Sequence, residues 1–62
     1  MEMLSELVGK KVALLTEMGD VERQEIGVLV GGQGHWVKVE KDNGEVVLYS
    51  VYLIRSIKQF GH

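Results

Sequence analysis

Apolar and polar residues alternate along most of this chain, and glycine and acidic turn clusters interrupt the alternation at regular intervals. A two-residue period of this kind is typical of β-strands with one buried face. The strands are expected at Lys11–Thr16, Glu25–Val30, His35–Glu40, Glu45–Ser50 and Leu53–Lys58. The clearest hairpin signal is Asn43-Gly44, because both residues readily adopt the positive φ of a tight turn. The pattern predicts an all-β protein with a single domain over residues 1–62.

A short amphipathic helix is expected before the first strand. Leu4, Leu7 and Val8 fall on one helical face, which predicts about one turn over Met3–Val8. Gly9 suits the left-handed residue that ends a helix. A helix this short is unstable alone, so we expect it to cover an apolar end of the sheet. A helix followed by five strands in 62 residues indicates a small, strongly bent barrel.

The alternation also predicts which face of each strand lies inside. Residues expected in the core are Val12, Leu14, Thr16, Val37 and Val39. In the second strand Ile26, Val28 and Val30 share one face, and Leu29 lies on the other. Gly27, in the middle of that strand, marks either a bend or a close approach of another backbone.

The fourth and fifth strands are apolar on both faces. A strand with one solvated face should alternate, so the extra apolar residues indicate a surface that a partner buries. The residues expected at an oligomer interface are Val46, Leu48, Tyr49, Val51, Leu53 and Ile54. The chain contains no proline to protect the edges of the sheet, which leaves them free to pair with another chain.

The length of the chain also favours an oligomer. A domain of about 60 residues buries only roughly 60% of the surface that its unfolded chain exposes, and is marginally stable. The chain contains no cysteine, so disulfides cannot supply the missing stability. We therefore expect a homo-oligomer that forms through edge strands, with a further protein partner as an additional expectation.

Charge and hydropathy limit the partners and the cellular location that we expect for the protein. Nine acidic residues face seven basic ones, and the charges are mixed along the chain without a basic run. A non-specific nucleic-acid binder usually carries a basic stripe. No apolar stretch is long enough to span a bilayer, and Glu2 and Glu6 are unlike the start of a signal peptide. We expect a cytoplasmic protein without a membrane partner.

The first half of the chain resembles a known family. The residues concerned are the helical segment Leu4–Val8, Gly9-Lys10-Lys11-Val12, Thr16 with Gly19, and Gly27-Val28-Leu29. They are similar to the first motif of the Sm-like proteins, and the five-strand outline is equally similar to Src-homology-3-like barrels. The Sm-like resemblance implies a bent five-stranded barrel with an N-terminal helix. It also implies rings in which strand four pairs with strand five of the neighbour, and many such rings bind uridine-rich RNA.

The chain departs from that family at its RNA site. The family holds a base with Asp and Asn between strands two and three, where this chain has Gly31-Gly32-Gln33-Gly34-His35. Its second motif, Ile-Arg-Gly, aligns with Leu48-Tyr49-Ser50, and the similar Ile54-Arg55-Ser56 falls in the last strand. If RNA binds, the candidate residues are Gln33, His35, Trp36, Lys38, Tyr49 and Arg55. Tyr52 is an alternative to Tyr49 for stacking on a base.

Recognisable catalytic chemistry is missing from the sequence. The glycine-rich stretch 31–34 leads into a strand, whereas a phosphate loop leads into a helix. His35 has only the terminal His62 as a second histidine, too few ligands for zinc. We expect no enzyme activity, cofactor or metal. The favoured function is a homo-oligomeric module for assembly or protein interaction. The alternatives are an RNA-binding ring and a small enzyme or metal site at a subunit interface.

Overall fold

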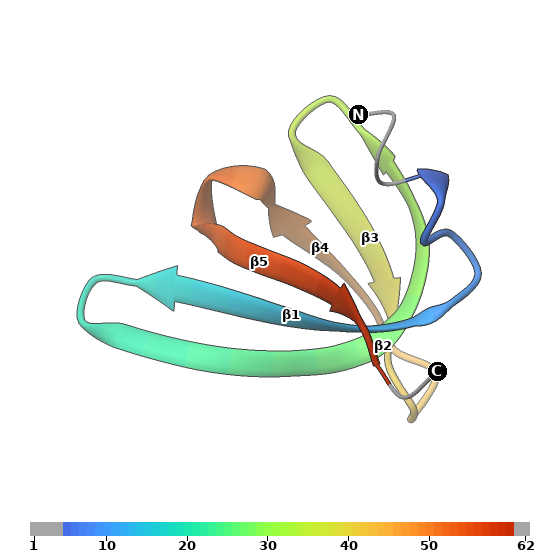
Figure 1. Ribbon diagram of the computed structural model, residues 1–62, viewed down its shortest axis with the longest axis horizontal. Coiled ribbons are helices and arrows are strands. Elements are labelled where there is room, and N and C mark those ends of the chain that lie inside the picture. The colour runs from blue at the N-terminus through green and yellow to red at the C-terminus, as the bar shows by residue number, and fades with distance from the viewer. Residues whose placement is uncertain (1–4, 61–62) are drawn as a thin grey trace.

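The computed structural model describes residues 5–60, which form one antiparallel sheet of five strands (Figure 1). Its elements are β1 (Lys11–Met18), β2 (Val21–Gln33), β3 (Trp36–Glu40), β4 (Val46–Ser50), the 3₁₀-helix η1 (Val51–Leu53) and β5 (Ile54–Gln59). The spatial order is β4-β3-β2-β1-β5. The all-β class expected from the alternation is confirmed, and each expected strand is present with shifted ends.

The sheet is strongly bent but does not close into the barrel expected from the sequence. Closure would need β4 to pair with β5, and each of these strands pairs on one side only. The chain between them turns away through η1, where Val51 N–H donates a 2.8 Å hydrogen bond to the His35 carbonyl. The Ser50 hydroxyl caps this turn by accepting from Tyr52 N–H at 3.3 Å. The turn carries the chain across to β1, so β4 and β5 remain the two edges of the sheet.

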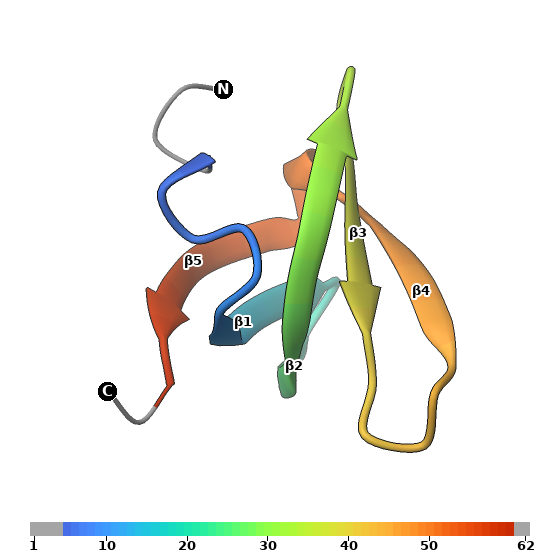
Figure 2. The same ribbon diagram turned by 90° about the vertical axis from the view of Figure 1, so that its right-hand side faces the viewer.

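The long strand β2 gives the sheet its shape. Its first part pairs with β1 in a hairpin arm, and its second part pairs with β3 (Figures 1 and 2). Figure 1 shows β2 curving through its middle, which is where Gly27 stands in the strand. A register shift between Leu29 and Gly31 adds a bulge where β2 pairs with β3. Bulges of this kind increase bend and twist in a strand.

The helix expected over residues 3–8 is not seen in the part that the structure describes. Met3 and Leu4 lie outside the described residues, and residues 6–9 form turns. Lys10 N–H donates to the Leu7 carbonyl at 3.0 Å, and Gly9 takes the expected positive φ of 86°. Leu7 still packs against the core. A single turn forms too few backbone hydrogen bonds to be a stable helix. The apolar end of the sheet is instead covered by the Leu7 side chain.

The core lies inside the curve of the sheet. The residues buried together there are Val12, Leu14, Leu29, Val37 and Val39. Ala13, between Val12 and Leu14 in β1, is also buried. Four of the five residues expected in the core are therefore confirmed as buried. Thr16 is only half-buried because it lies in the hairpin arm. In β2 the inward face carries Leu29 and Gly27, while Val30 is exposed. No helix within the described residues is long and apolar enough to cross a membrane.

Candidate functional site

Apolar side chains gather on the outer, convex face of the sheet. Strict alternation in β3 buries Val37 and Val39 and turns Trp36 and Lys38 outward. On β4, Leu48 stands opposite Lys38 in the register. We call Val30, Trp36, Leu48 and Val46 the outer patch; all four are exposed. A cavity of about 490 Å³ opens on this face, lined by Val30, Gly31, Gly32, Gln33, Trp36, Lys38 and Leu48.

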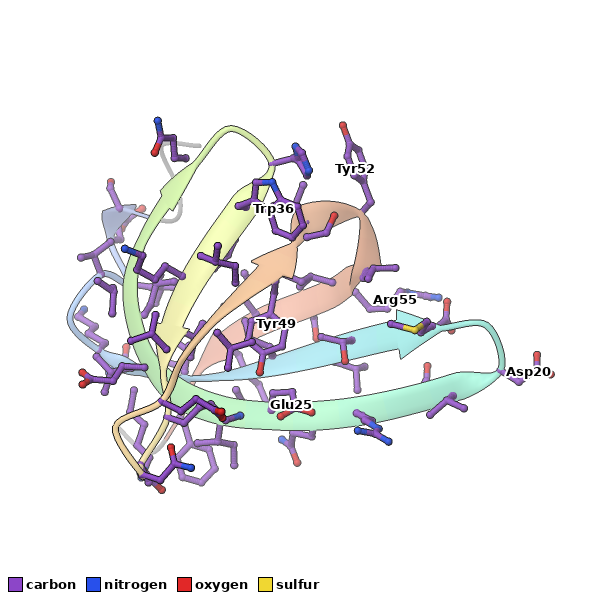
Figure 3. The ribbon with its side chains drawn as sticks, turned by 180° about the vertical axis from the view of Figure 1, so that it is seen from behind. Asp20, Glu25, Trp36, Tyr49, Tyr52 and Arg55 are labelled. Atoms are coloured by element: carbon purple, nitrogen blue, oxygen red, sulfur yellow. The ribbon has the colours of Figure 1, made fainter. Side chains whose placement is uncertain are left out.

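An aromatic cluster stands at one end of this face. The ring centroid of His35 lies 4.7 Å from that of Trp36 and 5.4 Å from that of Tyr52. The bond from Val51 N–H to the His35 carbonyl holds η1 against the β2–β3 turn and so brings Tyr52 to this place. Figure 3 shows Trp36 and Tyr52 at the same end of the molecule. Tyr52 is 82% exposed and Trp36 44%, so their ring surfaces are accessible for stacking.

A polar cluster on the inner face ties three parts of the chain together. Lys41 Nζ lies 2.8 Å from Glu25 Oε1 and 3.4 Å from the Tyr49 hydroxyl. That hydroxyl is also 3.5 Å from Glu25 Oε1, and Figure 3 shows Tyr49 and Glu25 close together. The cluster joins β2 to β4 and to the turn that follows β3, and it is half-buried.

The ion pair sets the charge states of this cluster. The hydrogen bond from Lys41 holds the pKa of the Glu25 carboxyl below its ordinary value, although partial burial acts in the opposite direction. The hydrogen bond to Glu25 raises the pKa of Lys41, again against desolvation. Both shifts favour the charged forms near neutral pH. An acid or base that works near neutrality needs the opposite shifts, so this pair is suited to holding structure.

Arg55 lies in a different place from the aromatic cluster. Its guanidinium Nη1 lies 2.8 Å from Glu17 Oε1, and this pair joins β5 to β1 in the hairpin arm. Figure 3 shows Arg55 beside that arm and away from Trp36. The pair is exposed, and salt bridges of this kind contribute little to stability.

A second apolar hollow lies inside the hairpin arm. It has a volume of about 410 Å³ and is lined by Thr16, Glu17, Met18, Val21, Arg23, Glu25, Tyr49 and Leu53. Met18 and Val21 flank the turn of the hairpin and are exposed. Sequence reasoning missed this hollow, although two large apolar residues on either side of Gly19-Asp20 were a usable signal.

The structure brings together four of the six residues considered for RNA. Gln33, Trp36 and Lys38 line the outer cavity, and His35 is stacked beside Trp36. Tyr49 points to the inner face, where it packs on the core and meets Glu25. Arg55 is engaged with Glu17. Tyr52, the alternative to Tyr49, is the tyrosine that lies in the cluster.

The six residues expected at an oligomer interface divide into two groups. Val46 and Leu48 are 52% and 54% exposed on the outer face of β4, and Leu53 is partly exposed. Tyr49, Val51 and Ile54 pack against the core of their own chain. Val30 completes the outer patch, and alternation alone missed it because the bulge beside Gly31 changes the facing of β2.

The described side chains do not form a ligand set for a metal ion. Within residues 5–60, no three His, Asp or Glu side chains gather closely enough to hold a metal ion. His62, the other histidine weighed as a ligand, lies outside the described residues. The ring contacts of His35 are with Trp36 and Tyr52.

Comparison of the chain with models of protein families, with curated proteins and with solved structures found no match. What the structure establishes is a small all-β fold with a bent, open, five-stranded antiparallel sheet.

Proposed function

We propose that this protein is a non-enzymatic assembly module that works as a homo-oligomer. The observation that carries the proposal is that β4 forms an exposed edge of the sheet. Its outward side chains Val46 and Leu48 belong to the outer patch. An exposed apolar edge strand is a template for pairing with another chain. A second copy that pairs there satisfies the free backbone groups and removes apolar surface from water.

The small core supports the same proposal. Only six apolar residues of the described chain are buried, while ten large apolar side chains are exposed. Domains of this size are marginal unless something else stabilises them. The chain contains no cysteine, and its described residues hold no metal cluster, so association is the stabilising device that remains.

The arrangement of the edges also supports the Sm-like or Src-homology-3-like character of the fold. The fourth and fifth strands lie at opposite edges of the sheet, where each is accessible to another chain. The bend in β2 and the glycine at its middle are in keeping with the same resemblance.

Thermal unfolding at several protein concentrations tests the proposal. Binding that occurs only in the folded state makes the midpoint depend on concentration. The midpoint should rise as the concentration increases from about 1 to about 100 µM if folded chains associate. A midpoint that stays constant across this range contradicts the assembly proposal.

A second candidate function rests on the aromatic cluster. Stacking of bases on accessible aromatic rings is the usual basis of single-strand recognition. His35, Trp36 and Tyr52 offer such rings beside Lys38, and this favours single-stranded RNA as a ligand. The net charge of −2 and the missing family residues at 31–35 and 48–50 rank it below assembly.

A further inference from the structure

The two edges of the sheet differ in how well they are protected against pairing. On β5, Arg55 and Lys58 carry charge, and the register with β1 passes from Ser56 to Ile54, which leaves Arg55 as a bulge. Charge and bulges are devices that keep edge strands from pairing. β4 contains no charged residue and no proline, and its register with β3 is uninterrupted. The edge that is open to a partner is therefore β4.

The backbone groups that β4 offers can be identified from its register. Lys41 N–H bonds to the Glu45 carbonyl and Val51 N–H to the His35 carbonyl, so residues 45 and 51 turn their groups toward the β3 side. Bonding alternates along a regular antiparallel ladder. The N–H and C=O groups of Val46, Leu48 and Ser50 therefore point to the open edge of the sheet.

We propose that β4 pairs antiparallel with β4 of a second copy, about a two-fold axis at Leu48. This inference rests on the proposed assembly function and names its partner and its edge. The pairing sets Leu48 against its own counterpart and Val46 against Ser50 of the other copy. These are the residues with free backbone groups, so each of them gains hydrogen bonds in the pair. The two sheets become one sheet of ten strands.

The side chains are compatible with this arrangement. Leu48, at the centre, meets an identical apolar side chain on the outer face, and the two outer patches become continuous. The closest charge on that face of β3 and β4 near the axis is Lys38, one strand behind β4. Its counterpart in the second copy is three strand spacings away, about 14 Å. That exceeds the screening length of about 8 Å at physiological salt, so the like charges do not oppose the pairing.

The other edge pairings are less favourable. Phe60 N–H bonds to the Lys11 carbonyl, so by alternation the backbone groups of Ile57 face the open edge of β5. Two copies of β5 that pair about Ile57 set the bulge at Arg55 against Gln59 of the other copy. Pairing of β4 with β5 of a neighbour must join a regular strand to one that is bulged at Arg55. Only the two-fold pairing of β4 joins two strands that have no bulge, and it produces a closed dimer.

Single cysteine variants test the register directly, since the chain contains no cysteine of its own. In Leu48→Cys the two Cα atoms across the axis are expected about 5.5 Å apart, within the range of a disulfide. Mild oxidation should convert most of this variant to a covalent dimer on a non-reducing gel. The matched control is Ser56→Cys, an exposed site at the middle of β5, which should remain a single chain.

A charge variant gives a second, independent readout. Leu48→Lys should shift the mass in solution to that of one chain, because it sets two ammonium groups face to face. Val21→Lys is the control, since Val21 is as exposed as Leu48, at 54%, and lies in the hairpin arm. It should leave the oligomer intact. Circular dichroism of Val21→Lys should match that of the parent protein, and Leu48→Lys should keep the parent spectrum at low temperature but unfold at a lower midpoint.

The outcomes separate this inference from the proposed function. If the parent chain is an oligomer but Leu48→Cys gives no dimer and Leu48→Lys keeps its mass, the edge is wrong and only this inference falls. A ladder of products from the double variant Leu48→Cys, Ser56→Cys means head-to-tail pairing of β4 with β5, and also overturns it. A parent chain that is a monomer at all concentrations overturns both.

Discussion

Gly27 lies so close to Glu40 that no side chain fits between them. A Cβ atom on Gly27 would stand 2.7 Å from the Glu40 carbonyl oxygen and 2.6 Å from Val39 Cγ1. Real Cβ atoms essentially never approach backbone this closely. Of the two roles open to this glycine from the sequence, the structure shows the close approach directly. The absence of a side chain lets β3 lie against β2 inside the curve of the sheet.

Gly27→Ala should therefore destabilise the fold by about 1–3 kcal/mol, the usual cost of inserting atoms into a closely packed site. The matched control is Gly31→Ala in the same strand, because a Cβ atom there meets nothing within 4 Å. Denaturant unfolding of both variants measures the difference. Equal midpoints for Gly27→Ala and the parent protein would show that β3 does not press on β2 at this point.

The ion pair between Glu25 and Lys41 should make stability depend on pH. Glu25 has a lowered pKa in the folded state, so its contribution is present above the pKa of the unfolded chain, near 4.3 for an ordinary Glu. It is lost as the pH falls through the lower, folded value. We expect Glu25→Gln to cost about 0.5–1 kcal/mol at pH 7 and almost nothing below about pH 3.

The contribution of Lys41 to stability depends on pH in the opposite direction. Its pKa is raised in the folded state, so its contribution is complete below the unfolded value, near 10.4, and is lost as the pH rises through the folded value. Thermal unfolding of the parent protein, Glu25→Gln and Lys41→Met across the pH range measures the loss of stability at low pH and at high pH. Because the two residues share one bond, the double variant should cost less than the sum of the single variants. Additive effects would contradict the pairing.

RNA binding should be weak. Lys38 is the cation beside the aromatic cluster, Arg55 is engaged elsewhere, and few phosphates can be neutralised by each chain. We expect a labelled uridine hexamer to bind no more tightly than about 10 µM at physiological salt, by fluorescence anisotropy of the assembled protein. Affinity below about 1 µM that Tyr52→Ala abolishes, while Tyr49→Phe retains it, would make RNA binding the better proposal.

The strands were largely predictable because alternation is a local property. β3 and β4 match their expected ranges to within one residue at the start. The hairpin arm was shorter in the prediction, since Glu22-Arg23-Gln24 is polar on both faces and shows no alternation. The expected closure of the barrel was wrong because it depends on η1, a three-residue turn whose Val51 N–H donates to the His35 carbonyl in the distant β2–β3 turn.

The candidate site was predictable only in part, because the pairing register of β3 with β4 decides which side chains of β4 point outward. Trp36 stands opposite Ser50, so the outward residues of β4 are even-numbered and Tyr49 must point inward. Alternation within β4 cannot supply this, because its residues are apolar on both faces. The pairing of His35 with Tyr52 depends on η1 and could not be read from spacing.

Light scattering coupled to gel filtration tests the assembly proposal most directly. At about 50 µM, above the midpoint of a typical weak self-association, we expect a mass that is a multiple of the 6.9 kDa chain. The pairing through β4 predicts two chains for each particle. A folded species of 6.9 kDa that persists at the highest attainable concentration would contradict the central claim.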